Sequence, residues 1–385
     1  MKKKIFFWAP FLEHIGTVKS TMNSALSLKR YCKNYEVYII NTCGEWNSYK
    51  KLCIENSIHL LNLNVNYFKF LPKGGFLFSR FSYLCIYLLS FLPLFFLLKK
   101  HKPQIIFLHL ITSLPLTILK LFNFETDFVL RISGYPKLNI MRKMLWKSVS
   151  NKLKFITCPT KDLKLDMEQS EIFEKRKLFY LPDAIMKIKD LKKEKNFLIP
   201  DEFPKNKRII LSVGRLTKQK NHFYLIKEFS KFLKKNDQFI LLIVGEGEKK
   251  KKLLKLTKKN QIDHRVFFTG FKKNVYNYMR QSDVLVLSSL WEEVGFVIVE
   301  AAFCNTFVIS SDCPNGPREF LDNGQNGILF KNNEEDALYK SFEKFAKLEE
   351  KKIFENKIRL KKNSKKYSVF NHYTNLNKIM RINNY

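Results

Sequence analysis

The sequence predicts an α/β protein with two doubly wound domains, and three observations support this fold class. Short apolar runs, which suit buried parallel strands, alternate with stretches of helical spacing along most of the chain. The chain has 385 residues, which is long for one domain and fits two of ordinary size. Hydrophobic residues make up 45% of the sequence, enough to build two buried cores.

The N-terminal half begins with an apolar run over residues 5–9 that predicts a buried strand. Gly16 is then expected in a loop, before a helix over residues 20–31. Further strands are predicted over residues 37–41, 104–108 and 128–132. His109 follows one of these strands directly, and Arg131 lies at the end of another. We expect this domain to cover residues 1–190.

A Lys-rich stretch over residues 185–207, with Pro200 and Pro204, is the predicted linker. Alternation restarts after it, and we expect a second domain over residues 205–365. Strands are predicted at residues 209–213, 239–244, 266–268, 284–287 and 307–310, with helices at 223–234, 249–259, 275–281 and 296–303. Eight of the 13 glycines fall in this half, mostly just after strands. Strand carboxyl ends line the ligand crevice of such sheets, so this half is the predicted nucleotide binder.

Residues 81–98 form an 18-residue stretch without a charge, flanked by Arg80 and Lys99-Lys100. By length it is a marginal transmembrane candidate. Three interpretations stay open: a buried core helix, a helix lying in the membrane interface, and a true span. We rank the span last, because it would leave too few residues before it for a complete domain.

The net charge of +34 comes from 69 Lys and Arg against 35 Asp and Glu. The basic residues are mostly Lys and are spread over the whole chain. One interpretation is a compositional bias towards Lys, which the codon usage of an AT-rich genome produces. The other interpretation is attraction to phosphate donors or to an acidic membrane leaflet. No zinc-finger spacing or RNA-recognition motif is present, so the charge alone does not predict nucleic-acid binding. Seven scattered cysteines without a Cys-x-x-Cys pair indicate free thiols in a reducing cytosol.

The first candidate motif covers residues 212–221. A strand leads into Gly214, where the absence of a Cβ lets the backbone approach a ligand. Arg215 and Lys220 follow at the same strand end. A guanidinium can contact phosphate in bidentate fashion and an ammonium adds a point charge, so together they would neutralise a diphosphate. The alternative is a strand and helix with two solvated cations.

The second motif covers residues 288–301 and holds Glu292 and Glu300, with Gly295 at the start of the helix that carries Glu300. The unpaired N–H groups of Gly295 and Phe296 could hold a phosphate at this helix N-terminus. Glu292 could accept sugar hydroxyls, and Glu300 a pair of ribose hydroxyls. The alternative is that Glu300 merely ends an apolar helix face, but a carboxylate there is costly without a partner.

Together these motifs resemble the retaining glycosyltransferases of family 4. The resemblance spans residues 205–335 and includes residues 311–319 as a further block. It implies the GT-B fold, with two facing Rossmann-like domains and a donor/acceptor crevice between them. It also implies that Arg215 and Lys220 bind the donor diphosphate, Glu292 contacts the donor sugar and Glu300 holds the ribose. Family members often return their final helix to the first domain, which we expect of residues 366–385.

The motif departs from the commonest family form because Glu293 and Val294 stand between Glu292 and Gly295. This leaves open whether Glu292 or Glu293 faces the sugar, and the seven-residue spacing to Glu300 favours Glu292. In the first domain, Gly16 resembles the family's glycine loop near the donor, although the usual Gly-Gly pair is absent. His109 resembles the family's histidine at the sugar site, or else it is a structural hydrogen-bonding residue.

The predicted function is a metal-independent hexosyl- or N-acetylhexosaminyl-transferase. It would use a nucleotide-sugar donor, a glycan or lipid-linked acceptor and no cofactor, in cell-surface polysaccharide or glycolipid synthesis. No Asp-x-Asp, His-x-x-x-His, Gly-x-Ser-x-Gly or Walker motif is present, so Arg215, Lys220 and a helix dipole would stabilise the leaving group. We expect a cytoplasmic protein, peripheral to the membrane, with no nucleic-acid partner. The rival is a basic membrane- or nucleic-acid-binding protein that uses its Rossmann domains only as scaffold.

Overall fold

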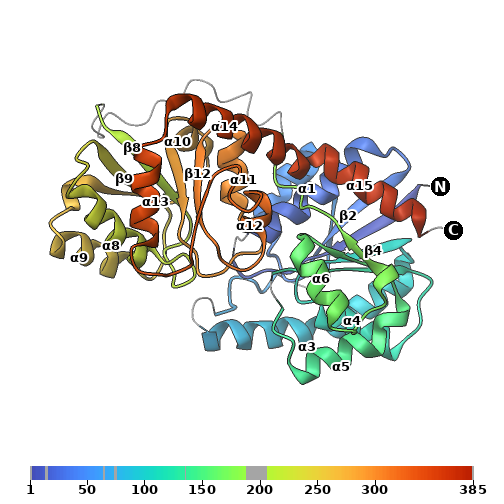
Figure 1. Ribbon diagram of the computed structural model, residues 1–385. Coiled ribbons are helices and arrows are strands. Elements are labelled where there is room, and N and C mark those ends of the chain that lie inside the picture. The colour runs from blue at the N-terminus through green and yellow to red at the C-terminus, as the bar shows by residue number, and fades with distance from the viewer. Residues whose placement is uncertain are drawn as a thin grey trace. The chain divides into compact units, whose positions relative to one another are not determined.

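The computed structural model describes residues 2–13, 16–63, 66–72, 76–134, 136–187 and 206–383. The chain divides into two compact units, which are described separately (Figure 1). Unit 1 comprises Met1–Ile185 together with Ser368–Tyr385, and unit 2 comprises Met186–Tyr367. Most of the predicted linker, residues 188–205, lies outside the described residues.

Unit 1 is built on a seven-stranded sheet in the order β3-β2-β1-β4-β5-β6-β7, and neighbouring strands pair in parallel. The order reverses between β1 and β4, which makes the sheet doubly wound, as the sequence predicts. Its strands are β1 (Lys3–Trp8), β2 (Tyr35–Asn41), β3 (His59–Asn62), β4 (Ile105–Leu108), β5 (Asp127–Arg131), β6 (Leu153–Cys158) and β7 (Leu178–Tyr180).

Alternate residues of β1 enter two different cores, because successive side chains of a strand point to opposite faces. Phe6 and Trp8 pack in one core, and Ile5 and Phe7 in the other. Residues of α3 to α6 contribute to the first core, and residues of α1, α2 and α15 to the second. These helices are α1 (Gly16–Tyr31), α2 (Lys50–Glu55), α3 (Phe76–His101), α4 (Ser113–Leu121), α5 (Ile140–Val149), α6 (Lys161–Gln169) and α15 (Val369–Ile382). Gly16, expected in a loop, therefore begins α1.

The C-terminal helix α15 packs on unit 1 beside α1 (Figure 1). Leu376 is fully buried, and Ile379 and Met380 are nearly so, in the same core as Val18 and Met22 of α1. This apolar contact joins the last helix of the chain to the first.

Helix α3 contains the apolar segment of residues 81–98. It is the one described helix that is long and apolar enough to cross a membrane, with a mean hydropathy of 2.2 in its most apolar window. Only 28% of that window is buried, so of the three open interpretations the buried core helix fits the structure poorly. Hydropathy alone could not reveal this, because an apolar helix has the same composition whether its outer face is covered or open.

Unit 2 is built on a six-stranded parallel sheet in the order β10-β9-β8-β11-β12-β13. The strands are β8 (Arg208–Val213), β9 (Phe239–Val244), β10 (Val266–Gly270), β11 (Val284–Leu287), β12 (Phe307–Ser311) and β13 (Ile328–Phe330). The helices are α8 (His222–Leu233), α9 (Lys250–Lys259), α10 (Tyr276–Arg280), α11 (Phe296–Phe303), α12 (Gly316–Phe320), α13 (Ala337–Ala346) and α14 (Glu350–Ser364). Each strand and helix predicted in this half is present, with ends that differ by at most two residues.

Candidate active site

The candidate site of unit 2 lies at the carboxyl ends of β8 and β11. These strands are neighbours in the sheet, but the chain continues from β8 to β9 on one side and from β11 to β12 on the other. The loops that follow β8 and β11 therefore diverge, and such a switch point is where open α/β sheets bind ligands. Arg215 and Lys220 lie on the first loop, and Glu292 lies on the second.

The loop after β8 passes very close to the loop after β9. A Cβ at Gly245 would lie 1.9 Å from the carbonyl oxygen of Gly214, so this position requires glycine. Gly245 also has a φ of +149°, which residues with a side chain rarely adopt. On the other side, the methylene stem of Lys220 packs over Gly214, where a Cβ would lie 3.2 Å from Cδ and Cε of the lysine. Glycine at positions 214 and 245 thus allows the loops after β8 and β9 and the Lys220 side chain to pack against one another at the carboxyl end of β8.

Three hydrogen bonds hold the loops after β8 and β11 together. The backbone N–H of Leu290 donates to the carbonyl of Gln219 at 2.8 Å, and the Ser288 hydroxyl donates to the carbonyl of Lys220 at 2.8 Å. The Gln219 amide donates to the carbonyl of Trp291 at 2.9 Å. The backbone on both sides of Lys220 and Glu292 is therefore fixed by local contacts.

Lys220 and Glu292 form an ion pair within this frame. The Nζ of Lys220 lies 2.5 Å from Oε1 of Glu292, and the two side chains are only 15% and 9% exposed. The Ser289 hydroxyl donates to the same carboxylate oxygen at 2.5 Å. Glu293 is half-buried, and its carbonyl accepts a hydrogen bond from the backbone N–H of Gly316. Of the two glutamates whose register was open, Glu292 is thus the one that meets the predicted phosphate-binding lysine.

Glu300 is 6% exposed and lies in the second turn of α11. The Tyr276 hydroxyl donates to its Oε1 at 3.5 Å. Gly295 precedes α11 with a φ of +74°, a left-handed conformation that favours glycine. The turn at Gly295 directs the chain into α11, so Phe296 begins the helix as predicted.

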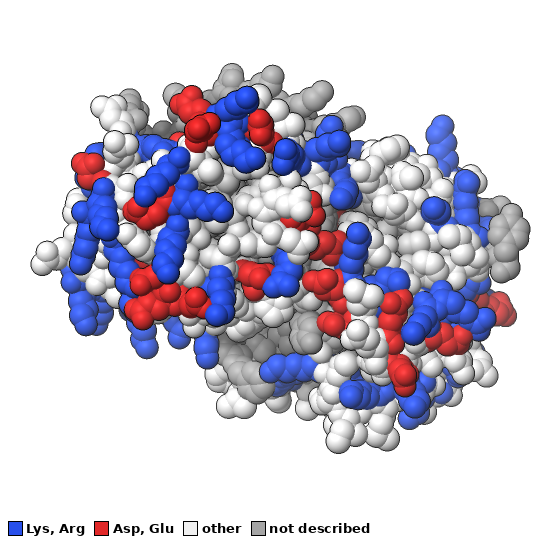
Figure 2. Space-filling view, in the orientation of Figure 1, with Lys and Arg blue, Asp and Glu red and all other residues white. Residues whose placement is uncertain are grey.

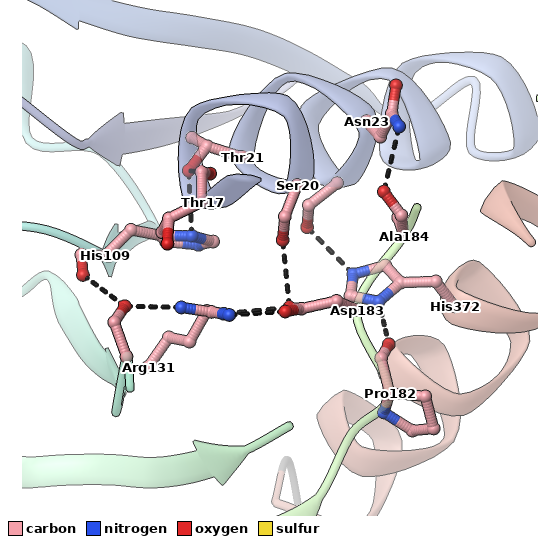
Figure 3. A network of polar contacts seen from close by, with 12 residues as sticks. Thr17, Ser20, Thr21, Asn23, His109, Arg131, Pro182, Asp183, Ala184 and His372 are labelled. Carbon is pink, nitrogen blue, oxygen red and sulfur yellow. Dashed lines mark hydrogen bonds and ion pairs between the residues drawn. The ribbon is translucent and has the colours of Figure 1, made fainter. Parts of the chain in front are cut away.

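In unit 1, His109 follows β4 and is 4% exposed (Figure 3). The Thr21 hydroxyl uses its single proton to donate to the carbonyl of Thr17 at 2.8 Å. His109 Nδ1 lies 3.0 Å from the same Thr21 oxygen, within hydrogen-bond distance. Burial, and then the charges of Arg131 and His372, hold the pKa of His109 well below its usual range. His109 is consequently a buried ring that stays neutral near pH 7.

Arg131 does not present a cation for a ligand in this structure, because it forms a buried ion pair with Asp183 (Figure 3). Its Nε lies 2.9 Å and its Nη2 2.5 Å from the two carboxylate oxygens, and the side chains are 6% and 2% exposed. The Ser20 hydroxyl donates to Asp183 at 2.9 Å. Arg131 also donates to the Ser133 hydroxyl, which donates to the carbonyl of His109. This chain of contacts fixes the backbone at His109.

The same network includes the C-terminal helix (Figure 3). His372 of α15 donates from Nδ1 to the carbonyl of Pro182 at 2.7 Å, and accepts from the Ser24 hydroxyl at Nε2 at 2.9 Å. Asn23 donates to the carbonyl of Ala184 at 2.8 Å. Residues 182–184 are thus held between α1 and α15.

The sequence of residues 193–367 matches the family glycosyl transferases group 1. The matched residues include all six strands of the unit 2 sheet, β8 to β13, and both candidate motifs. This matched segment, called the group 1 domain below, is similar to that family over somewhat less than half of the chain. Together with the named relatives, this match supports a transferase enzyme of the glycosyltransferase class.

Two curated relatives illustrate the similarity. A glycosyltransferase of Methanocaldococcus jannaschii is 37% identical over 131 residues, which is 34% of this chain and 31% of the relative. The Campylobacter jejuni enzyme N-acetylgalactosamine-N,N'-diacetylbacillosaminyl-diphospho-undecaprenol 4-alpha-N-acetylgalactosaminyltransferase is 28% identical over 290 residues, 71% of this chain and 77% of that enzyme.

Solved structures show that the whole chain has the GT-B fold. Anabaena HepE, solved with UDP and glucose, superposes with a TM-score of 0.73 at 15% identity, covering 99% of this chain and 100% of that one. A variant of S. aureus TarM, solved with UDP, gives a TM-score of 0.73 at 14% identity, covering 98% and 99%. Both predicted Rossmann-like domains are confirmed.

Within the described ranges, no three His, Cys, Asp or Glu residues gather in a way that could hold a metal ion. The predicted residues of the group 1 domain follow the carboxyl ends of β8 and β11, whereas Gly16 and His109 belong to unit 1. Sequence reasoning missed Ser289, Tyr276, Asp183 and His372. Ser289 precedes Glu292 inside the motif and could have been suspected, whereas the other three become visible only through contacts between distant segments.

Proposed function

We propose that this glycosyltransferase moves a sugar, with retention of anomeric configuration, from a nucleotide-sugar donor to a glycan or lipid-linked acceptor. The transferred group would be a hexose or an N-acetylhexosamine, and the product a cell-surface polysaccharide or glycolipid. Named relatives support this class of acceptor, since one acts on a diphospho-undecaprenol substrate and another on poly(ribitol-phosphate). The observation that carries the proposal is the Lys220–Glu292 ion pair at the switch point of the group 1 domain.

The pair suits a reaction in which charge separates across one bond. When the bond between the anomeric carbon and the diphosphate oxygen breaks, the diphosphate gains negative charge and the sugar gains positive charge. A donor bound here would bring its diphosphate to Lys220 and Arg215 and its sugar to Glu292. The cations then stabilise the leaving group, and the carboxylate stabilises the sugar. Before the donor binds, Glu292 balances the buried charge of Lys220, which would otherwise be costly.

The acceptor hydroxyl oxygen forms the new bond to the anomeric carbon, on the face from which the diphosphate departs. Its proton passes to the departing nucleoside diphosphate, so atoms and charge balance without an enzyme nucleophile. The proposal assigns the ribose to Glu300 and a phosphate to the backbone N–H groups of Gly295 and Phe296. It also assigns Gly16 and neutral His109 of unit 1 to donor contact, and it needs neither metal ion nor cofactor.

Two measurements test the proposal. A thermal-shift screen against nucleoside diphosphates and their sugars should find a ligand that raises the melting temperature, because a ligand that binds only the folded state stabilises it. The matching nucleotide sugar should then release nucleoside diphosphate when lipid-linked or glycan acceptors are supplied, and proton NMR of the product should show the donor's anomeric configuration. Binding of lipid or nucleic acid without any transfer would instead support a scaffold role for the Rossmann domains.

A further inference from the structure

Helix α3 exposes its most apolar side. The α3 stripe, defined as Leu77, Phe81, Leu84, Leu88, Leu92 and Phe96, is between 53% and 78% exposed at every position. These residues are three or four apart, so they form one continuous row along the helix. At 1.5 Å per residue the row is about 29 Å long. A row of large apolar side chains of this length is unusual on the surface of a soluble domain.

The opposite side of α3 is the one that packs on unit 1, and it is partly polar. Ser82 is fully buried and donates to the carbonyl of Pro72 at 2.7 Å. Ser90 is also fully buried, and the Tyr87 hydroxyl donates to Thr117 at 2.9 Å. Leu94 and Leu98 complete the attachment in the core shared with α4. The inward side of α3 thus combines apolar and polar contacts, and the outward side carries the apolar row where an ordinary surface helix carries polar residues.

Topology argues against a membrane span. Strands β1, β2 and β3 precede α3, and β4 follows it after three residues. β4 pairs directly with β1 in the same sheet. A span would place the two ends of α3 on opposite sides of a bilayer, and one sheet cannot be divided in that way. A contact of this helix with a membrane would therefore run along the bilayer surface and not across it.

The sequence segment that holds α3, α4 and α5 is more one-sided in charge than the chain as a whole, although Glu168, Glu171 and Glu174 of the next segment lie beside Lys147 of α5. Between Glu55 and Asp162 the sequence holds 15 Lys and Arg but only two acidic residues, Glu125 and Asp127, whereas the whole chain has 69 against 35. Both acidic residues are engaged, with Lys102 at 3.2 Å and Lys154 at 3.7 Å. A uniform compositional bias towards Lys would give about two basic residues for each acidic one, so it does not explain this segment.

Helix α5 packs on α4, which in turn packs on α3. It exposes Met141 and Met144, at 81% and 67%, beside the exposed Lys143 and Lys147. Arg142 of α5 lies close enough to Arg80 of α3 for their like charges to interact. Basic side chains lie beside uncharged surface at the lower edge of this unit (Figure 2), where Figure 1 shows α3 and α5.

We propose that the α3 stripe and the outer face of α5 form a docking surface for an anionic lipid bilayer. The apolar row would enter the boundary between headgroups and acyl chains, and the surrounding Lys and Arg side chains would contact the lipid phosphates. Docking would hold the enzyme on the leaflet that carries a lipid-linked acceptor. Lipid binding itself does not depend on the proposed sugar transfer, so each can fail without the other.

The test is sedimentation of the full chain with sucrose-loaded vesicles, either pure phosphatidylcholine or containing phosphatidylglycerol. We expect binding to the anionic vesicles only, and partial release by high salt. Leu88→Glu/Leu92→Glu should weaken binding about tenfold or more, because two apolar side chains can no longer enter the bilayer. The matched control is Phe354→Glu/Ile358→Glu on α14, two residues with the same spacing and exposures of 60% and 50%, which should bind like the wild type.

A second pair of variants separates the charge from the apolar row. Lys143→Glu/Lys147→Glu on α5 should weaken anionic binding, while Lys251→Glu/Lys255→Glu on α9 should not. Circular dichroism and the melting temperature verify that each variant is folded. The proposal is overturned if the wild type ignores anionic vesicles, or if Leu88→Glu/Leu92→Glu binds them as well as its control. The proposal is also overturned if the α3 stripe instead forms a contact between two copies of the chain. In that case the wild type would be a dimer that does not bind vesicles, and Leu88→Glu/Leu92→Glu would be a monomer.

Discussion

Replacing Asp183 with Asn should strongly destabilise unit 1. The substitution keeps the shape of the side chain but removes the charge that balances Arg131, whose side chain is only 6% exposed. Removing one partner of a buried pair costs about 3 to 5 kcal/mol, because the other charge stays buried without compensation. Asp183 also accepts from Ser20 of α1, so the loss reaches the contact between α1 and residues 182–184.

The assay is urea unfolding followed by circular dichroism, with the transition of unit 1 identified by limited proteolysis. With a slope of about 1 to 3 kcal/mol per molar urea, the loss moves the midpoint down by roughly 1 to 3 M or more. Asp162→Asn, an exposed carboxylate in the first turn of α6, is the matched control and should cost less than about 1 kcal/mol.

The double variant Arg131→Met/Asp183→Leu removes both charges and should recover most of the lost stability. Two results would refute the reasoning. One is that Asp183→Asn unfolds at the same urea concentration as Asp162→Asn. The other is that the double variant is less stable than Asp183→Asn, which would mean that Arg131 is not an unbalanced charge in the single variant.

Three further predictions concern the group 1 domain. Arg215→Ala and Lys220→Ala should each lower turnover on the order of a hundredfold, since each removes charge stabilisation from the leaving diphosphate, and wild-type turnover in both would disprove the assignment. Transfer should continue in EDTA, and a strict need for added magnesium or manganese would contradict the proposed charge stabilisation. Burial, with a smaller effect of Lys220, lowers the pKa of His222 to about 3. At pH 5 the unfolded chain, with a His pKa of about 6.5, therefore binds a proton that the folded chain does not. The free energy of unfolding should fall by about 2 kcal/mol between pH 7 and pH 5 from this group. His222→Asn should reduce that pH dependence, and an unchanged pH dependence in urea unfolding would show that His222 does not cause it.

The sequence predicted the fold of unit 2 closely because apolar runs, helical spacing and turn residues there all indicate the same strands and helices. The strands Phe239–Val244 and Val284–Leu287 are short, continuous apolar runs that end at glycine or serine, and their predicted bounds are the observed ones. In unit 1 the strands β3, β6 and β7 were not predicted. β3 and β7 have only four and three residues, whereas β6 is a mostly buried strand inside the sheet. Local pattern therefore predicted most of the central strands, but it missed the short edge strands β3, β7 and β13 and the interior strand β6.

Among the site residues, those within a sequence motif were predicted and those that depend on long-range contacts were not. Lys220 and Glu292 were predicted from motifs, and the structure adds that they contact each other across 72 positions of sequence. Asp183 carries no motif, and its pairing with Arg131 depends on how β5 and the segment after β7 fold together. The outward apolar row of α3 was open to three interpretations in sequence, because composition does not state which face of a helix is covered.

The central claim is that the donor sugar meets Glu292 in the group 1 domain. Steady-state kinetics with the donor varied, on Glu292→Ala, Glu293→Ala and Glu300→Ala, test it most directly. Glu292→Ala should mainly lower turnover, because a carboxylate at the sugar stabilises the transition state more than the substrate. Glu300→Ala should mainly raise the Michaelis constant, since the ribose does not change charge, and Glu293→Ala should be mild. A crippled Glu293→Ala beside an active Glu292→Ala would contradict the claim.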